Sequence, residues 1–122
     1  MTLVTALWVA LGAAIGAPTR YLADRAVQAT HGTGFPWGTF TVNVVAALVL
    51  GIVLGGPAPG AVTAAVGVGF CGALSTWSTL GYDTVRLAEE GSRSGATLNV
   101  VMSMFAGLGA VSLGVAVGAA LW

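Results

Sequence analysis

The chain lacks lysine altogether, and charged residues make up only 7% of its 122 residues. A soluble domain carries about 25% charged residues, so the composition excludes an ordinary water-soluble protein. With four arginines and no lysine there is no basic patch, and we expect no nucleic-acid partner. The single cysteine, Cys71, rules out an internal disulfide and cannot bind a metal ion alone. The chain also lacks a nucleophile–base pair and a phosphate-binding loop, so we predict that it is not an enzyme.

Hydrophobic residues, by contrast, make up 57% of the chain and fall into four apolar segments. The segments cover approximately residues 3–22, 37–55, 61–88 and 96–121, and each reaches the roughly 20 residues that a membrane-spanning helix needs. The first segment has neither a basic leader nor a small-residue cleavage site, so we interpret it as a retained span. The sequence therefore predicts an all-α, multi-pass protein of the cell membrane, embedded in the lipid bilayer, with residues 1–122 in one domain.

Glycine is abundant, with 19 copies, and pairs spaced four apart occur in three segments: Gly12/Gly16, Gly51/Gly55 and Gly114/Gly118. In lipid, such small residues let helix backbones approach closely. Packing between helices of one chain and a dedicated dimer contact would both use this spacing. Of these two interpretations, we favour packing within one chain.

The charged residues are distributed unevenly between the two faces of the membrane. All the arginines fall at or near the first and third connections: Arg20, Arg25, Arg86 and Arg93. In a four-span protein these connections share one face, and both termini share the other. The positive-inside rule places the arginine-bearing face in the cytoplasm, so it predicts that both termini face outward. Near the end of the third segment, we expect the charged side chains to be solvated at the membrane interface: Asp83, Arg86, Glu89 and Glu90.

Residues 69–79, GFCGALSTWST, interrupt the third apolar segment. Two glycines three apart are followed by serines and threonines around a single tryptophan. Backbone polar groups at membrane depth must be paired, so an interrupted helix survives there only when it is buried in protein or lines a wet cavity. Membrane transport proteins place their ion sites at broken helices of this kind. The sequence therefore predicts a break in the third helix and an ion site at that break.

Polar side chains inside the other segments are costly in lipid, so each needs an explanation. Thr39 and Asn43 lie four apart in the second segment, and Asn99 and Ser103 have the same spacing in the fourth. Either pair alone is well explained by hydrogen bonds between helices. Together with the hydroxyl groups after the break, the pairs suggest a narrow polar pathway. Arg20 could extend to the interface or contribute to an anion-attracting vestibule, and the sequence leaves both roles open.

Three motifs occur in order along the chain: GAAIGAPTRY at residues 12–21, GTFTVN at residues 38–43, and GFCGALSTWST at residues 69–79. Together they resemble the Fluc (CrcB) fluoride channels of microbial membranes, and the resemblance covers essentially the whole chain. It implies a fluoride-selective passive channel that exports cytoplasmic fluoride and so reduces fluoride toxicity. It also implies an antiparallel dimer of four-helix subunits, with two pores and one central sodium ion that is not transported.

The resemblance further implies which residues carry these roles. The backbone carbonyls of Gly72 and Ser75 would hold the sodium ion. The fluoride pore would use the asparagine of the second helix, two positions that are phenylalanine in the family, the hydroxyl pair between them, and polar residues of the fourth helix: Asn43, Trp77, Leu80, Ser78, Thr79, Asn99 and Ser103. Thr39, on the same helix face as the pore asparagine, would extend the path.

Two positions depart from the family pattern, because Trp77 and Leu80 stand where the family has phenylalanines. Leu80 removes an aromatic edge, so the pore could be slower, less selective or silent. The dimer partner could be a second copy or a paralogous subunit, and this chain could be the non-conducting member of such a pair. A small four-helix multidrug-type exporter is a further alternative. It would need a membrane-embedded carboxylate in residues 3–22, which contain none.

Overall fold

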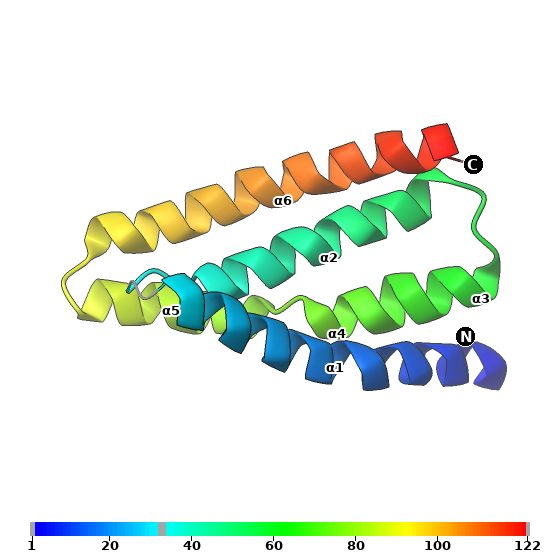
Figure 1. The fold of residues 1–122 in the computed structure, drawn as a ribbon, viewed down its shortest axis with the longest axis horizontal. Coiled ribbons are helices and arrows are strands. Elements are labelled where there is room, and N and C mark those ends of the chain that lie inside the picture. The colour runs from blue at the N-terminus through cyan, green and yellow to red at the C-terminus, as the bar shows by residue number, and fades with distance from the viewer. Residues whose placement is uncertain (1, 32–33, 122) are drawn as a thin grey trace.

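The computed structural model describes residues 2–31 and 34–121, with His31 described in its backbone alone. Four helical segments of membrane-spanning length and apolarity form a bundle (Figure 1). The first, second and fourth are α1 (Leu3–His31), α2 (Trp37–Gly55) and α6 (Arg93–Leu121). All regular secondary structure in the described residues is helical. The prediction of an all-α, multi-pass membrane protein is therefore confirmed.

The third segment is divided into consecutive pieces. α3 (Gly60–Val62) leads into the π-helix η1 (Thr63–Cys71) and then into α4 (Gly72–Leu74). Ser75 and Thr76 are both extended, and α5 (Trp77–Glu89) begins directly after them. The predicted break is thus confirmed, but it lies after Gly72, which keeps helical φ and ψ angles of −64° and −36°. Serine and threonine interrupt the helix here because their side chains compete for backbone hydrogen bonds.

α1 is longer than the apolar pattern predicts. The apolar segment ends at residue 22, whereas the helix continues to His31, because residues 23–31 include good helix formers and neither glycine nor proline. Arg20 therefore lies well inside α1, about 16 Å from its C-terminal end at 1.5 Å per residue. α6 likewise begins earlier than expected, at Arg93. Residues 32–33 of the first connection lie outside the described residues.

The glycine pairs pack helices of this one chain together. Gly51 and Gly55 of α2 approach α6 so closely that a Cβ on either would clash with an α6 carbonyl oxygen. Gly114 and Gly118 of α6 approach α2 in the same way, and the pair on α1 does so against η1. Packing within one chain, the interpretation favoured from the sequence, is confirmed for all three pairs.

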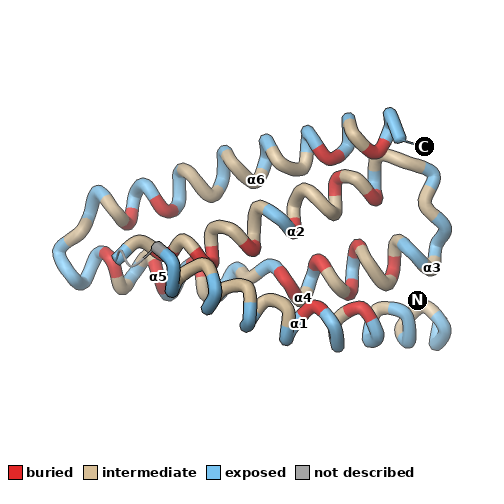
Figure 2. Tube along the Cα trace, viewed as in Figure 1, coloured by how far each residue is buried: buried red, intermediate tan, exposed pale blue. Residues whose placement is uncertain are grey.

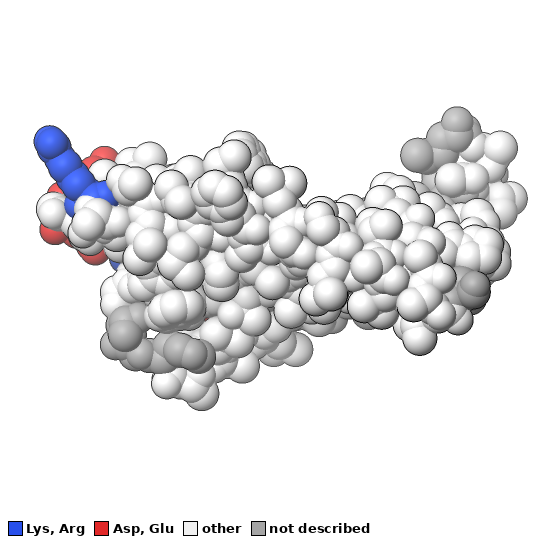
Figure 3. Space-filling model, turned by 90° about the horizontal axis from the view of Figure 1, so that it is seen from above, with Lys and Arg blue, Asp and Glu red and all other residues white. Residues whose placement is uncertain are grey.

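The two ends of the bundle differ in charge. Both termini and the α2–α3 connection lie at one end, and the α1–α2 and α5–α6 connections lie at the other (Figure 1). Every charged side chain belongs to residues 20–25 or 83–93. Figure 3 shows the visible charges gathered at a single end of the molecule. The positive-inside rule uses such asymmetry to predict the orientation of a protein in the membrane.

A small hydrophobic core lies beside the break in the third segment. Val42 and Ala46 of α2 pack there against Cys71 and Leu74, and all four residues are buried. Buried residues face the interior of the bundle, whereas much of its outer surface is exposed (Figure 2). Large apolar side chains on α1, α5 and α6 remain exposed, as expected for helices that contact lipid. The core fixes the position of the break against α2.

Candidate functional site

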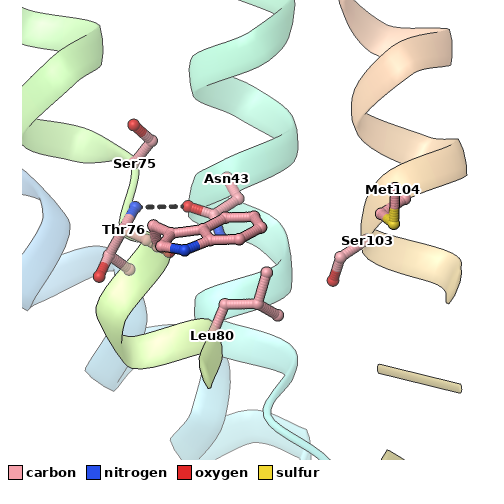
Figure 4. A pocket seen from close by; sticks show the side chains of 7 residues that line it. Asn43, Ser75, Thr76, Leu80, Ser103 and Met104 are labelled. Carbon is pink, nitrogen blue, oxygen red and sulfur yellow. Dashed lines mark hydrogen bonds between the residues drawn. The ribbon is translucent and has the colours of Figure 1, made fainter. Parts of the chain in front are cut away.

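Asn43 of α2 binds the main chain at the helix break. Its Oδ1 accepts a 2.7 Å hydrogen bond from the N–H of Thr76, and its Nδ2 donates a 3.1 Å bond to the carbonyl oxygen of Thr76. Figure 4 shows the first of these bonds and the extended chain that it holds. An N–H group can only donate and a carbonyl can only accept, so these partners fix the orientation of the amide. Asn43 therefore holds Thr76 through both of its polar atoms.

Several carbonyl groups lose their helical donors at the break, and those of Gly72 and Ser75 are among them. In a continuous helix the Thr76 N–H would bond to the Gly72 carbonyl, and the Thr79 N–H would bond to the Ser75 carbonyl. Here the first donor goes to Asn43, and the second goes to the Thr76 hydroxyl at 3.1 Å. Freed carbonyl oxygens are the ligands that hard cations prefer. The residues present therefore fit the sodium ion that the family resemblance implies.

Gly72 and Ser75 both line a cavity of about 390 Å³ between α2 and the third segment. Asn43 also reaches this cavity, and its other walls are mostly apolar: Ala46, Ala47, Leu50, Gly67, Val68 and Cys71. A Cβ added at Gly72 would meet no atom within 4 Å, so the helix opens outward here. The described residues contain no group of three or more His, Cys, Asp or Glu side chains that could hold a metal ion. A cation at this position would therefore take uncharged oxygen ligands, from the main chain or from the Asn43 and Ser75 side chains.

A neighbouring cavity of about 230 Å³ is lined by uncharged residues of α2, the break, α5 and α6: Asn43, Ser75, Thr76, Trp77, Leu80, Ser103 and Met104 (Figure 4). The Ser103 hydroxyl is buried and has no hydrogen-bond partner in the described part of the chain. Trp77, directly after the break, is 83% exposed. The cavity combines an amide, a free hydroxyl and an indole ring without a fixed charge. It unites four of the residues expected to line the pore: Asn43, Trp77, Leu80 and Ser103.

Thr39 and Thr79 line a third cavity, of about 250 Å³, at the charged end of the bundle. Asp83 and Arg86 also line it. The Thr39 hydroxyl donates a 3.0 Å hydrogen bond to Asp83 Oδ2, and Arg86 Nε lies 3.9 Å from Asp83 Oδ1. Arg86 also donates from Nη2 to the Gly34 carbonyl at 3.3 Å, so it ties the first connection to α5. This cavity combines hydroxyl groups with a carboxylate–guanidinium pair.

The burial of Asp83 corrects the expectation that it is solvated at the interface. Its exposed fraction is only 8%, because it faces α2 and bonds to Thr39. The sequence did contain a signal for this position. Leu80, Asp83 and Leu87 are spaced three and four apart, share one face of α5 and are all buried. A carboxylate within an otherwise apolar stripe marks a buried, paired group, whereas Glu89 and Glu90 are exposed as expected.

Asn99 and Ser78 line neither of the two polar cavities. Asn99 is completely buried between α6 and α5, and its Nδ2 donates a 3.0 Å hydrogen bond to Thr84 Oγ1. Its Oδ1 has no hydrogen-bond partner in the described residues. Ser78 is exposed on α5. Asn99 therefore contributes an unpartnered acceptor and, because Nδ2 has two N–H groups, one further donor.

Arg20 lies near the level of the break rather than at a helix end. α1 and the third segment run in parallel, and Gly16 contacts Ala73 and the main chain of Phe70. One helical turn further along α1 brings Arg20 close to the level of the extended residues. Its Nε is buried and has no hydrogen-bond partner in the described residues. Arg20 is thus a half-buried cation whose Nε donor is unused within the described residues.

The sequence matches known proteins along nearly its whole length. The family model described as "CrcB-like protein, Camphor Resistance (CrcB)" matches residues 7–115. A relative named fluoride-specific ion channel FluC 1, from Frankia casuarinae, is 54% identical over 125 residues, which cover 95% of this chain and 97% of the relative. A protein of the same name from Streptomyces avermitilis is 47% identical with the same coverage. Fluoride-specific ion channel FluC 2 from Natronomonas pharaonis is 45% identical over 99% of this chain and 100% of the relative. The chain therefore belongs to the CrcB-like family.

Proposed function

We propose that this protein is a subunit of a passive, fluoride-selective ion channel. The observation that carries the proposal is the uncharged cavity lined by Asn43, Trp77 and the unpartnered Ser103 hydroxyl. The names of the relatives, which are fluoride-specific ion channels, support fluoride as the transported ion. Membership of the CrcB-like family removes the support for a multidrug-type exporter.

The chemistry of this cavity suits a small, strongly hydrated anion. A path for fluoride must replace lost water with hydrogen-bond donors, and the Ser103 hydroxyl supplies one. An amide carries two N–H donors, so Asn43 keeps one after bonding to Thr76. The edge of the Trp77 ring is electropositive and its indole N–H is a donor. Because conduction needs binding that is weak enough for release, a cavity without a fixed cation favours passage over trapping.

The polar cavity at the charged end would continue this path. Thr39 and Thr79 line it, and Thr79 is next in the chain to Leu80, which lines the uncharged cavity. Ser78 is exposed, so it would face the path only where a second subunit completes the wall. Arg20 would supply positive charge to a vestibule at the level of the break, since its Nε has no partner in the described residues.

We further propose an antiparallel dimer with a central sodium ion that is not transported. One subunit offers the Gly72 and Ser75 carbonyls, whereas hard cations take about six oxygen ligands. A second subunit related by a two-fold axis would present the same oxygens to the same ion. When bound, the sodium ion would supply the positive charge that balances the facing carbonyl dipoles. The open face at Gly72 supports this contact.

As a passive pathway, the channel would let fluoride leave the cytoplasm down its gradient and so reduce fluoride toxicity. Purified protein in liposomes loaded with fluoride or chloride tests this directly. We expect fast fluoride release and little chloride release. Ser103→Ala should slow fluoride release by about 10- to 150-fold, the scale of one hydrogen bond to a charged group. Ser94→Ala, in the exposed first turn of α6, is the matched control and should release fluoride at the wild-type rate. Wild-type vesicles that retain fluoride, or that release chloride equally fast, would overturn the proposal.

A second candidate is a non-conducting subunit that pairs with a paralogous channel subunit. Leu80 in place of an aromatic residue favours it, and so does the numbering of relatives as FluC 1 and FluC 2. A homodimer that assembles in liposomes yet releases no fluoride would support this candidate. Fluoride release by the chain alone would exclude it.

A further inference from the structure

Asn43 and Ser75 form the boundary between two cavities at the break. They are the two residues that line both the uncharged cavity containing Ser103 and the apolar cavity containing Gly72. The first cavity carries the proposed fluoride path, and the second contains the carbonyls proposed to bind sodium. The two sites therefore meet at one amide side chain and one peptide group.

The peptide between Ser75 and Thr76 is held by Asn43 through its N–H group. Its N–H belongs to Thr76 and bonds to Asn43 Oδ1 at 2.7 Å. The peptide is trans, and the N–H and C=O of a planar trans peptide point in opposite directions. The hydrogen bond therefore turns the Ser75 carbonyl away from Asn43. Donation by the N–H also polarises the peptide, which strengthens its oxygen as a ligand for a cation.

The same hydrogen bond controls the Gly72 carbonyl. The Thr76 N–H is the donor that a continuous helix would give to Gly72, and Asn43 takes it instead. The Thr76 hydroxyl acts in parallel, because it takes the Thr79 N–H that would otherwise reach Ser75. Two side chains, Asn43 and Thr76, thus keep both carbonyls available.

We propose that Asn43 is the positioning residue of the sodium site, acting through the main chain of Thr76 in addition to lining the fluoride path. The proposal rests on the proposed function for the existence of a sodium site. The two roles use opposite ends of one amide: Oδ1 holds the peptide that presents the carbonyls, and Nδ2 keeps a second N–H for the anion. Sodium binding should then follow the acceptor, and fluoride release should follow the donor.

Substitutions at these two positions separate the roles. Asn43→Leu keeps the branching at Cγ and has no polar atom, so it releases the Thr76 N–H to the Gly72 carbonyl and lets the helix close. Asn43→Asp keeps an acceptor for that N–H and loses both the donor for the anion and the bond to the Thr76 carbonyl, which is not one of the two carbonyls proposed to bind sodium. Thr76→Val removes the cap on Thr79, whereas Thr76→Ser retains it.

The measurement is the thermal unfolding midpoint and the dimer fraction of the full-length protein in detergent. Both are followed against sodium chloride concentration, with N-methylglucamine chloride holding the ionic strength constant. We expect the wild-type midpoint to rise with sodium. In Asn43→Leu and Thr76→Val the sodium concentration for half of this rise should increase about 10–100-fold, as when a residue that orients a metal ligand is removed. Asn43→Asp and Thr76→Ser should stay close to the wild type, although Asn43→Asp should lose fluoride release.

Gln28→Leu is the matched control. Gln28 is also an amide that holds main chain at both ends, accepting from Gly38 N–H at 3.2 Å and donating to the Phe35 carbonyl at 3.1 Å, but it lies at the charged end. Its loss should lower the unfolding midpoint without changing the sodium concentration for half of the rise.

Equal sodium responses in Asn43→Leu and Gln28→Leu, or no sodium response in the wild type, would overturn the proposal. If Asn43→Leu does not fold, the comparison of Thr76→Val with Thr76→Ser decides in its place. A sodium response in a wild type that releases no fluoride would refute the fluoride path alone.

Discussion

The Thr39 hydroxyl and the Asp83 carboxylate, 44 residues apart in the chain, are joined by a 3.0 Å hydrogen bond inside the bundle. Both residues are buried, with exposed fractions of 4% and 8%. The bond ties α2 to α5 one turn along α2 from Asn43, so it supports the helix half that begins at the break. A buried carboxylate without its donor would keep the cost of desolvation and lose the compensation.

Replacing Thr39 with valine should therefore destabilise the protein. Valine has nearly the same shape as threonine and cannot donate to Asp83, so we expect a loss of about 1–3 kcal/mol in the free energy of unfolding. Thr39→Ser keeps the hydroxyl and should recover most of this loss. Thermal unfolding in detergent measures the difference. Thr41→Val, two residues away and on another face of α2, is the control; a Thr39→Val protein as stable as Thr41→Val would show that the hydrogen bond contributes nothing.

A side chain at Gly72 should separate assembly from folding. A Cβ there would meet no atom of the same subunit within 4 Å, whereas a Cβ at Gly69 would strike the main chain of α1 at Val9. In the proposed dimer, Gly72→Val would place its methyl groups between the two subunits beside the sodium ion. We expect Gly72→Val to keep its helical content and become monomeric by size-exclusion chromatography with light scattering. Gly69→Val should instead lose about 1–3 kcal/mol of subunit stability through overpacking.

Gly109→Val provides the control for this experiment, because Gly109 is also a helical glycine with open space at its Cβ position. It lies on α6, away from the break, and should remain dimeric. A dimeric Gly72→Val protein would contradict the assignment of this face to the subunit contact.

The features that the sequence predicts well are those that leave a local pattern. Apolar runs mark the four spans, and glycines four apart mark close helix contacts such as Gly51 against α6. The sequence identifies Asn43 as an amide that is costly to place in lipid, but it does not identify the partner Thr76, which is 33 residues away. That pairing depends on how α2 is rotated against the third segment, which hydropathy alone does not determine. The burial of Asp83 escaped prediction because its position near a helix end indicates solvent, although its spacing from Leu80 and Leu87 places it on the buried face of α5.

The one-sided charge distribution predicts a fixed orientation in the membrane. Arg25, Arg86 and Arg93 lie toward the end that carries the α1–α2 and α5–α6 connections, and the opposite end has no arginine, so the positive-inside rule places the first end in the cytoplasm. In a Cys71→Ala background, a cysteine added after the C-terminus should react with an impermeant maleimide in intact cells. Ser94→Cys, exposed at the opposite end, should react only after the membrane is permeabilised. Equal labelling of both positions from outside would reject a fixed orientation and favour dual topology.

Leu80 offers a direct test of what the missing aromatic ring does. Its side chain is 9% exposed and lies between the uncharged cavity and an apolar cavity of about 330 Å³, which Val100 and Met104 also line. This space can accept a phenylalanine ring without rearranging the helices, and the ring edge would face the proposed path. An edge contact between two aromatic rings contributes about 0.5–1.5 kcal/mol, and a contact of the same strength to fluoride would change the rate roughly two- to tenfold. We therefore expect Leu80→Phe to release fluoride faster from liposomes by about that factor. Leu80→Met, which conserves volume without adding a ring, should match the wild type. If Leu80→Met also released fluoride faster, the gain would come from flexibility in the cavity wall and not from the ring. A Leu80→Phe protein no faster than the wild type would show that Trp77 already supplies the aromatic edge that the path requires.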